Sequence, residues 1–369
     1  MPMTQANGRV LNVGLIGLGE VAQVVHLPVL QSLPRLYRIA AVCDISPELV
    51  RHIGRQYNVE RQYTDMLELV KQDDLDVVFV LNSDEYHADA VIAAADRKRH
   101  VLVEKPMCLT FAEADAIREA RDRNGVTVMV GYMRRYAAAF AEAVKEIGGL
   151  ESVAYARVRD IIGPNSYFIR PTSHTVTFAD IPAEAAADRK ARAERLGAEA
   201  TGLTPDSPLI GVYRFLCGLG SHDLSAMREA IGMPRAVIGA KVAQQKDALF
   251  LNAILDYGSF SVTYETGNDL QGRFDAHLEV YGSRKSVKVQ YDTPYIRHLP
   301  TRMIVGETVG EVYTETVVRP TFTDPYTLEL KALYDAVVHG AQIKTTPEDY
   351  VNDLKLFGMI MKALRRQEA

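Results

Sequence analysis

A glycine-rich turn near the amino terminus restricts the possible folds of this chain more than any other segment. Residues 17–22 read GLGEVA, a G-x-G-x-x-A pattern that follows the apolar run Leu11 to Ile16. The stretch behind it, Val21 to Leu30, is suited to a helix that Pro28 should kink or end. Small residues in such a strand–turn–helix unit let the backbone approach a pyrophosphate at the helix N-terminus. The predicted dinucleotide-binding residues are Gly17, Gly19, Glu20, Val21 and Ala22.

An acidic residue further along the chain indicates which dinucleotide binds. Asp44 ends the next predicted strand, 22 residues after Ala22, where a carboxylate can accept hydrogen bonds from the adenosine ribose hydroxyls. The same carboxylate repels a 2'-phosphate, and Ile45 and Ser46 offer no basic group to attract one. We therefore predict NAD as the cofactor, with NADP as the less favoured alternative. The alternative is that these residues bind no ligand and form only a tight turn followed by a solvated aspartate.

The remaining pattern predicts an α/β protein with two domains. Strand-like runs alternate with helical stretches up to Gly131, which is typical of a parallel sheet covered on both faces. After Gly131, longer β-rich runs are interrupted by fewer helices. We therefore predict a doubly wound Rossmann domain for NAD in residues 1–131, and a substrate-binding and oligomerisation domain in residues 132–369. The strand-like runs of the first domain after the glycine turn are Arg38–Val42, Val77–Leu81, Val101–Val103 and Val126–Val130.

Two helical segments can be placed from local signals. Thr110 and Glu113 form a capping box, which predicts a helix that runs to about Asn124 with Gly125 as its cap. Residues 183–200 are rich in alanine and charge and have almost no apolar face. We expect them to form an exposed helical insertion.

Composition and charge argue against several classes of partner. The formal net charge of −5 provides no broad basic field for a nucleic acid or an anionic membrane. Cys43, Cys108 and Cys217 lie far apart, which favours a reducing compartment. No apolar run approaches the ~18 residues of a membrane span, and Met1 to Arg9 lack the apolar core of a signal sequence. We expect a cytoplasmic protein that binds no nucleic acid, membrane or metal.

Three further motifs follow the later strands of the first domain. Residues 82–87 read NSDEYH, residues 104–106 read EKP and residues 131–136 read GYMRRY. With residues 219–222, LGSH, they resemble the Gfo/Idh/MocA oxidoreductases, and the resemblance extends over nearly the whole chain. The E-K-P triplet matches the family completely, whereas the family's T-P-N-x-x-H segment is matched firmly only at His87.

The resemblance implies an NAD-dependent oxidoreductase that moves a hydride between nicotinamide and a hydroxyl-bearing carbon of a sugar, sugar derivative or cyclitol. It implies a second domain of α+β type with a large open, mostly antiparallel sheet, and an active site in the cleft between the domains. It also implies a homodimer or homotetramer formed through the outer face of that sheet. The cofactor contacts that it adds are Asn82, His87, Glu104 and Lys105, with a frequently cis bond before Pro106.

The same resemblance assigns the catalytic groups. Oxidation of a carbinol needs a base, because the hydroxyl proton must leave as the hydride departs. In the family Lys105 would contact the nicotinamide ribose and the reacting hydroxyl, and a lysine beside a cationic ring should lose its proton more readily. His222 corresponds to an active-site histidine that can relay the proton. Without the other motifs, Lys105 would read as a solvated lysine and His222 as a core or surface histidine.

One position departs from the family pattern. The aspartate expected four residues before the histidine is Gly218 here. Asp223 can replace it only if no helix has begun there, since neighbouring helical residues are turned by about 100°. Either Lys105 and His222 suffice or activity is altered. A decayed site would suit a dinucleotide-sensing regulator without catalytic activity.

Polar and aromatic residues of the second domain suit a polyhydroxylated ligand. Arg135 and Asp160 are the preferred candidates because they lie just past predicted strand ends. An alternative activity within the family is an enzyme that retains NAD and uses transient sugar oxidation to eliminate a glycosidic substituent. The predicted substrate ligands are Arg135, Tyr136, Asp160, Asn165 and His222, with Arg159, Tyr167 and His174 as further candidates.

Overall fold

The computed structural model describes residues 9–368, and this part of the chain forms two compact units. Each unit is assembled from three stretches of sequence, so residues far apart along the chain belong to the same unit. Unit 1 contains residues 9–131, 174–193 and 329–349, and unit 2 contains residues 132–173, 194–328 and 350–368.

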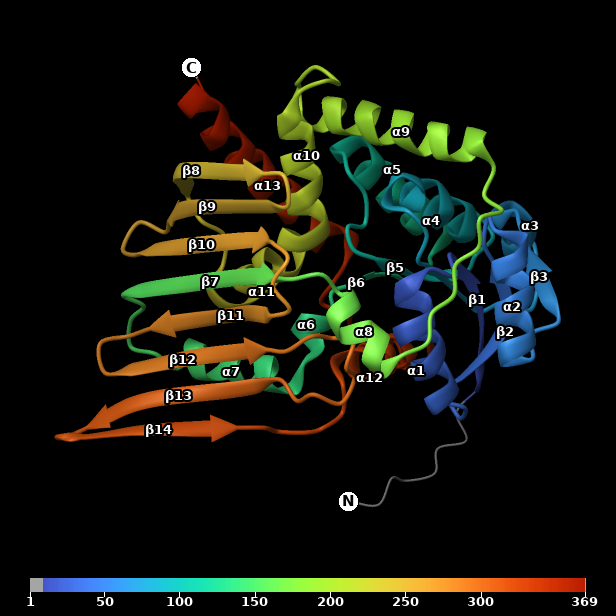
Figure 1. Cartoon of the computed structure of the whole chain (residues 1–369). Helices are drawn as coiled ribbons and strands as arrows, with labels where there is room; N and C mark the ends of the chain where they lie inside the picture. Colours follow the sequence, from blue (N-terminus) through green and yellow to red (C-terminus); the bar gives the residue numbers. More distant parts are fainter. Residues whose placement is uncertain (1–8, 369) are drawn as a thin grey trace. The chain divides into compact units, whose positions relative to one another are not determined.

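Unit 1 is built on a six-stranded sheet with the order β3-β2-β1-β4-β5-β6 (Figure 1). Every strand pair in it is parallel. The order reverses between β1 and β4, which is the switch point where open parallel sheets bind ligands. The strands are β1 (Leu11–Ile16), β2 (Tyr37–Cys43), β3 (Arg61–Tyr63), β4 (Val77–Val80), β5 (His100–Glu104) and β6 (Val128–Gly131).

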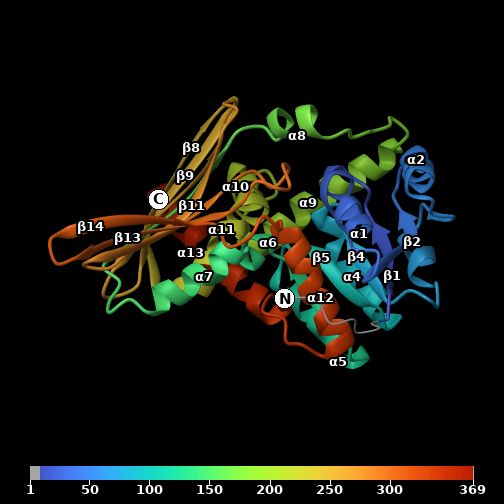
Figure 2. The ribbon, with the colours of Figure 1, turned by 90° about the horizontal axis from the view of Figure 1, so that it is seen from below.

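Helices connect these strands and lie against the sheet (Figure 2). The central strands are buried along almost their whole length, as expected for a parallel sheet covered on both faces. The helical elements are η1 (Ala22–His26), α1 (Leu27–Ser32), α2 (Pro47–Tyr57), α3 (Met66–Val70), η2 (Asp84–Tyr86), α4 (His87–Asp96), α5 (Phe111–Asn124) and the larger part of α12 (Pro325–His339).

Local signals account for the ends of two helices. The predicted helix α5 is confirmed: Glu113 N donates to the Thr110 hydroxyl at 3.1 Å, Thr110 N donates to the Glu113 carboxylate at 3.0 Å, and Gly125 ends the helix at φ +63°. The expectation for Pro28 needs correction. The π-helical turn η1 passes directly into α1, so the helical run continues through Pro28 to Ser32 and does not end at the proline.

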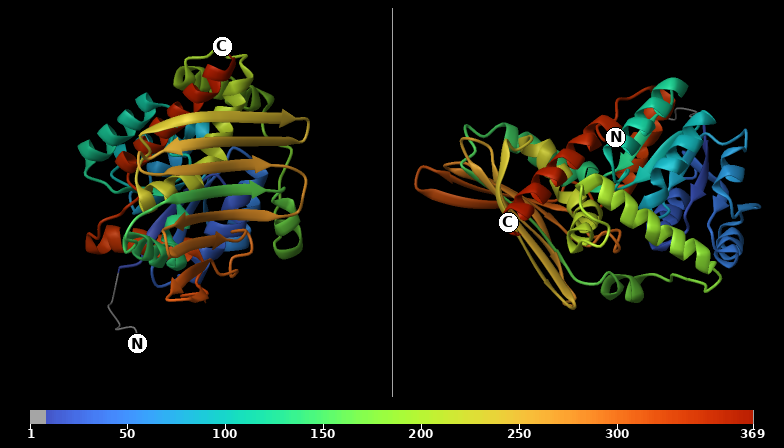
Figure 3. Two further views of the ribbon diagram at one scale, coloured as in Figure 1. Left: turned by 90° about the vertical axis from the view of Figure 1, so that its left-hand side faces the viewer. Right: turned by 90° about the horizontal axis from the view of Figure 1, so that it is seen from above.

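Unit 2 is built on an eight-stranded sheet with the order β14-β13-β12-β11-β7-β10-β9-β8 (Figure 3). Only β7 and β10 pair in parallel, and the other pairs are antiparallel. The predicted α/β fold class, with a second, mostly antiparallel sheet, is therefore confirmed. The strands are β7 (Tyr155–Ile162), β8 (Ala236–Gln245), β9 (Ala248–Asp256), β10 (Ser261–Asn268), β11 (Phe274–Tyr281), β12 (Lys285–Tyr291), β13 (Arg302–Val309) and β14 (Val312–Val318).

Helices of unit 2 pack on one face of this sheet. Helix α7 contacts β12 and β13, and α11 contacts β7 and β11. In the view of Figure 3 that faces the sheet, no described helix of this unit covers its other face. The helical elements are α6 (Met133–Tyr136), α7 (Ala138–Gly148), α8 (Ser166–Thr172), α10 (Pro208–Phe215), η3 (Leu216–Gly220), α11 (Ser221–Ile231) and most of α13 (Pro347–Glu368).

The alanine-rich segment forms helix α9 (Ala183–Thr201). Its first part, up to residue 193, belongs to unit 1, and its last part, with the buried Leu196, belongs to unit 2. In unit 1, Arg192 pairs with Asp89 at 2.7 Å and its guanidinium lies over the ring of Tyr86. No helix among residues 9–368 is both long and apolar enough to cross a bilayer.

Candidate active site

The glycine turn meets the end of β4 at the switch point of unit 1. Gly17 adopts φ +93°, and a Cβ on it would lie 2.4 Å from the backbone nitrogen of Asn82. Only glycine fits there, because both the backbone angle and the contact exclude a side chain. A Cβ on Gly19, in contrast, would meet no atom within 4 Å. The turn is therefore tight against the protein at its first glycine and open at its second, as close approach by a pyrophosphate requires.

Asp44 is held in place by two backbone donors. Leu18 N donates to its Oδ2 at 2.8 Å, and Ser46 N donates to its Oδ1 at 3.0 Å. The carboxylate thus joins the glycine turn to the start of α2 and remains half-buried. Of the other predicted cofactor residues on this turn, Ala22 is fully buried, Val21 is half-buried and Glu20 is exposed. An acidic group for a ribose and an open backbone for a pyrophosphate fit an adenine dinucleotide.

The loops after β4 and β5 are tied together by His87. Its Nδ1 lies 2.7 Å from the Pro106 carbonyl oxygen and its Nε2 lies 2.9 Å from the Asn82 carbonyl oxygen. His87 is buried, and the Lys105–Pro106 peptide bond is cis. His87 therefore connects the loop that carries Asn82 to the loop that carries Lys105, and both of its ring nitrogens are occupied by protein carbonyls.

A buried pair behind Lys105 was missed by sequence reasoning. His26 Nε2 lies 2.8 Å from Glu104 Oε1, and Lys105 N donates to Glu104 Oε2 at 3.2 Å. Burial raises the pKa of the Glu104 carboxyl, but the hydrogen bond with His26 and its charge outweigh burial, so this pKa lies below its ordinary value. Glu104 is thus an ionised acceptor that orients the backbone next to Lys105. The signal for this pair was the position of His26, one helical turn after Ala22.

In unit 2, His222 stands at the start of α11, where η3 passes directly into this helix. It is half-buried. A Cβ on Gly218 would meet no atom within 4 Å, so the missing aspartate side chain would have room. Helix α11 has begun before Asp223, so the condition under which Asp223 could replace the family's aspartate is not met. Asp223 is buried and pairs with Arg134 instead.

Arg134 joins two carboxylates in the core of unit 2. It pairs with Asp160 at 3.1 Å and with Asp223, and its guanidinium lies 5.1 Å from the ring centre of Tyr291. Burial raises the pKa of the Asp223 carboxyl well above its ordinary value, Arg134 opposes this rise, and Asp160 adds to it. One guanidinium therefore compensates two buried acids, and the raised pKa of Asp223 reflects the cost of burying its charge beside that of Asp160.

The other predicted substrate ligands differ in burial: some lie in the core and others are half-buried or exposed. Asp160 is 0% exposed and Arg135 is 3% exposed. Arg135 pairs with Glu229 at 2.5 Å, so both of these side chains are committed to ion pairs in the core. Tyr136 is half-buried, and Asn165, also half-buried, donates to the Tyr295 hydroxyl at 3.3 Å. Arg159 pairs with Glu265 and Asp275, Tyr167 is 57% exposed, and His174 is exposed and belongs to unit 1.

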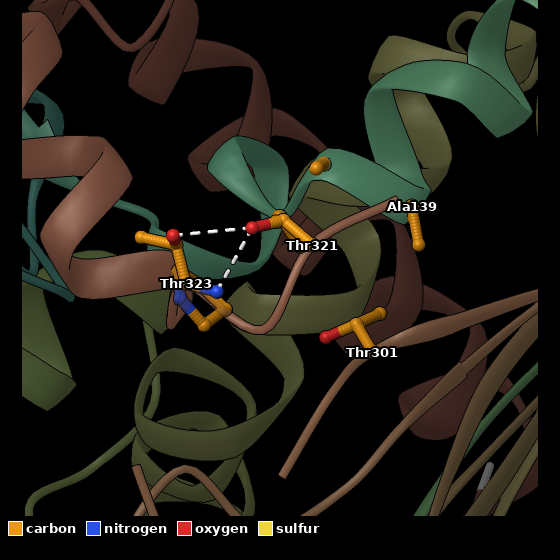
Figure 4. A pocket seen from close by; sticks show the side chains of 7 residues that line it. Ala139, Thr301, Thr321 and Thr323 are labelled. Atoms are coloured by element: carbon orange, nitrogen blue, oxygen red, sulfur yellow. Dashed lines mark hydrogen bonds between the residues drawn. The ribbon is translucent and has the colours of Figure 1, made fainter. Parts of the chain in front are cut away.

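A small pocket in unit 2 is lined by residues other than the predicted substrate ligands (Figure 4). The hydroxyl of Thr321 donates to that of Thr323 at 3.1 Å, and Thr323 N donates to the Thr321 hydroxyl at 3.0 Å. No acid, base or nucleophile of the predicted set reaches it, so it carries no catalytic argument. Its lining residues are Ala137, Ala138, Ala139, Thr301, Thr321, Thr323 and Pro325. In residues 9–368 there is no group of three His, Cys, Asp or Glu side chains arranged to hold a metal ion.

The glycine turn, the acid after β2 and the switch point together define unit 1 as a dinucleotide-binding domain of the Rossmann type. Residues 11–132 match the family model GFO_IDH_MocA, described as "Oxidoreductase family, NAD-binding Rossmann fold". This part of the chain is therefore similar to the NAD-binding Rossmann domain of the Gfo/Idh/MocA oxidoreductases.

Individual relatives and solved structures show how much of the chain is similar to known proteins. Inositol 2-dehydrogenase of Salmonella typhimurium is 34% identical over 128 residues, which cover 34% of this chain and only 38% of that enzyme. The scyllo-inositol 2-dehydrogenase (NADP(+)) IolW of Bacillus subtilis is 23% identical over 379 residues, covering 97% of this chain and 94% of the relative. Among solved structures, the aldose-aldose oxidoreductase from Caulobacter crescentus complexed with glycerol has a TM-score of 0.73 at 19% identity, over 97% of this chain and 98% of that one. This last likeness shows a common fold.

Proposed function

We propose that the protein is an NAD-dependent oxidoreductase that transfers a hydride between nicotinamide and a secondary or anomeric hydroxyl carbon of a sugar, sugar derivative or cyclitol. The observation that carries this proposal is the position of Lys105. Strand β5 ends at Glu104 and pairs with β4, the neighbour of β1. Carboxyl ends of parallel strands meet at one edge of a sheet, so the Lys105 loop and the glycine turn share the edge where such sheets bind their ligands.

Different residues of this chain would bind the cofactor and transfer the proton. The Gly17 to Ala22 turn and Asp44 would hold the pyrophosphate and the adenosine ribose, and Asn82 and Glu104 would support the nicotinamide end. When bound, the nicotinamide ring supplies the hydride acceptor or donor. Lys105 would take the hydroxyl proton during oxidation and return it during reduction, because a positioned base lowers the cost of separating charge.

We propose His222 as the second proton-handling group, with Tyr136 and Asn165 as hydroxyl-binding side chains. An imidazole can both donate and accept a proton near neutrality, which suits a relay to and from a substrate hydroxyl. Arg135 and Asp160 are not carried into this proposal, because both side chains are buried and form ion pairs within the protein. The names of the relatives support a small polyol as the substrate, with inositols and aldoses as the first compounds to test.

The open space at Gly218 allows a direct test of the missing carboxylate. Gly218→Asp should fold normally and move the acidic limb of the pH profile of kcat upward by about one unit, because a carboxylate on the same helix face favours the imidazolium form of His222. Gly218→Asn, which has the same shape without the charge, should leave the profile in place. Equal profiles for the two variants would exclude His222 as a titrating group in turnover.

We further propose that the chain forms a homodimer or homotetramer through the helix-free face of the eight-stranded sheet and acts in the cytoplasm. Ile238 and Ile254 support the first part, since they are 65% and 47% exposed on the neighbouring strands β8 and β9. The three cysteines are free and buried, which supports a reducing compartment. Light scattering of the purified chain should give the mass of two or four copies, and a monomer at micromolar concentration would contradict the assembly.

A further inference from the structure

A segment from the middle of the sequence lies on the nucleotide-binding edge of unit 1. Gln23 follows the glycine turn directly, and its Nε2 donates both to the Leu18 carbonyl oxygen at 2.8 Å and to the Val176 carbonyl oxygen at 3.0 Å. Val176 N donates back to Gln23 Oε1 at 2.9 Å. The ring of Phe178 packs 6.1 Å from the ring of His52 in α2. Residues 176–180 therefore run from the glycine turn to the helix that follows Asp44.

Asp180 ends this segment against the first turn of α2. The Ser46 hydroxyl donates to its Oδ1 at 2.5 Å, and Glu48 N donates to its Oδ2 at 2.8 Å. These hydrogen bonds, with that of Ser46 as the largest contribution, hold the pKa of the Asp180 carboxyl below its ordinary value. The structure thus brings a second carboxylate, ionised at neutral pH, close to the residues that follow Asp44.

The backbone donors of Ser46, Glu48 and Leu49, which follow Asp44, are engaged by the protein itself. Ser46 N donates to Asp44 at 3.0 Å, and Leu49 N donates to the Ser46 hydroxyl at 3.1 Å. Glu48 N is taken by the Asp180 carboxylate, and Pro47 has no N–H to offer. An additional anion that used the N–H of Ser46, Glu48 or Leu49 would have to displace an existing acceptor.

We propose that Asp180 is a cofactor-specificity residue, which excludes the adenosine 2'-phosphate of NADP and so selects NAD. This inference rests on the proposed function. The acid at the end of the second strand binds the adenosine ribose in this type of fold, so a 2'-phosphate would lie beside Asp44 and the residues that follow it. There it would meet the negative charges of Asp44 and Asp180 and compete with Asp180 for the Ser46 hydroxyl and the Glu48 N–H.

The test isolates the adenosine end of the cofactor. Dissociation constants of 2',5'-ADP and 5'-AMP, measured by titration calorimetry on the full chain, report the contribution of the 2'-phosphate without any need for turnover. Asp180→Asn should improve the affinity for 2',5'-ADP relative to 5'-AMP by about tenfold to a hundredfold, because it removes a negative charge and replaces one acceptor oxygen, which frees one donor for a charge-assisted bond. The affinity for NADPH relative to NADH, measured by the fluorescence change on binding, should shift by the same factor.

Two further variants serve as controls. Asp188→Asn removes the same charge from the same stretch of unit 1, where Asp188 accepts a hydrogen bond from the Tyr86 hydroxyl at 2.5 Å, and it should leave the ratio unchanged. Asp180→Glu keeps the charge and should keep the preference of the wild type. The ratio compares the dissociation constants of two ligands on the same variant. A general loosening of residues 176–180 would affect both constants equally and so would not change their ratio.

The possible failures can be told apart. A wild-type chain that binds neither NADH nor 5'-AMP overturns the proposed function. A wild-type chain that binds NADH, together with an unchanged ratio in Asp180→Asn, overturns only the role of Asp180. An equal shift in Asp180→Asn and Asp180→Glu also overturns it, since the charge would then not be what excludes the phosphate.

Discussion

Replacing Lys105 with alanine is expected to lower kcat by a factor of about 10² to 10⁴ and to weaken the affinity for NADH far less. The proposed base is then absent, so the hydroxyl proton must leave to water while the hydride is transferred. The loop itself should persist, because His87 and the His26–Glu104 pair hold it through contacts that do not include the Lys105 ammonium. Initial rates with NAD+ and a panel of inositols and aldoses provide the measurement, starting with any compound that the wild type oxidises.

The matched control for this variant is Lys355→Ala, which removes an exposed lysine of α13. It should behave as the wild type in both rate and NADH binding. Partial recovery of Lys105→Ala by small primary amines would support a role in proton transfer, since an external base would then replace the missing one. A Lys105→Ala variant that turns over at the rate of the wild type would exclude this residue as the base. A panel on which the wild type shows no turnover at all would count against the proposed enzyme.

The largest expected effect on stability comes from Arg134. Arg134→Met should lower the free energy of unfolding by about 3–5 kcal/mol, because it leaves buried acids without their counter-charge. The loss should also depend on pH. Asp223 already has a folded-state pKa raised above its unfolded value, so its contribution to stability decreases as pH rises. Arg134 opposes that rise, and removing it should therefore cost more at about pH 8 than at about pH 5.5.

Urea denaturation at the two pH values measures this difference. The double variant Arg134→Met, Asp160→Asn removes one of the two acids together with the cation, so it should recover part of the lost stability and flatten the pH dependence. Arg302→Met, at a half-buried position of strand β13, provides a substitution of the same kind outside the cluster. If Arg134→Met lowers the free energy of unfolding equally at both pH values, the carboxyls of the cluster do not take up protons when Arg134 is absent.

The features that could be predicted from sequence depend on neighbours within a few residues or within one strand–helix–strand unit. The Thr110 capping box is closed by a residue three positions away, and the glycine turn, Asp44 and their strands follow one another directly. The alternation of strand-like and helical stretches was sufficient to predict the parallel sheet for the same reason. The limits of that reasoning appear at Pro28, where a π-helical turn changed the local geometry that a regular helix would have had.

The amino-acid sequence alone determined the glycine turn, the acid that follows the second strand and the α/β class of the first domain, because these are local patterns with a fixed spacing. Only the tertiary structure decided which charges meet. His26 and Glu104 are 78 residues apart, Arg134 and Asp223 are 89 apart, and Ser46 and Asp180 are 134 apart. No local pattern reports such pairs, since the energy that selects them comes from burial and charge compensation after distant segments have folded together. For that reason Arg135 and Asp160 looked like exposed ligands from their place after predicted strands and yet lie in the core.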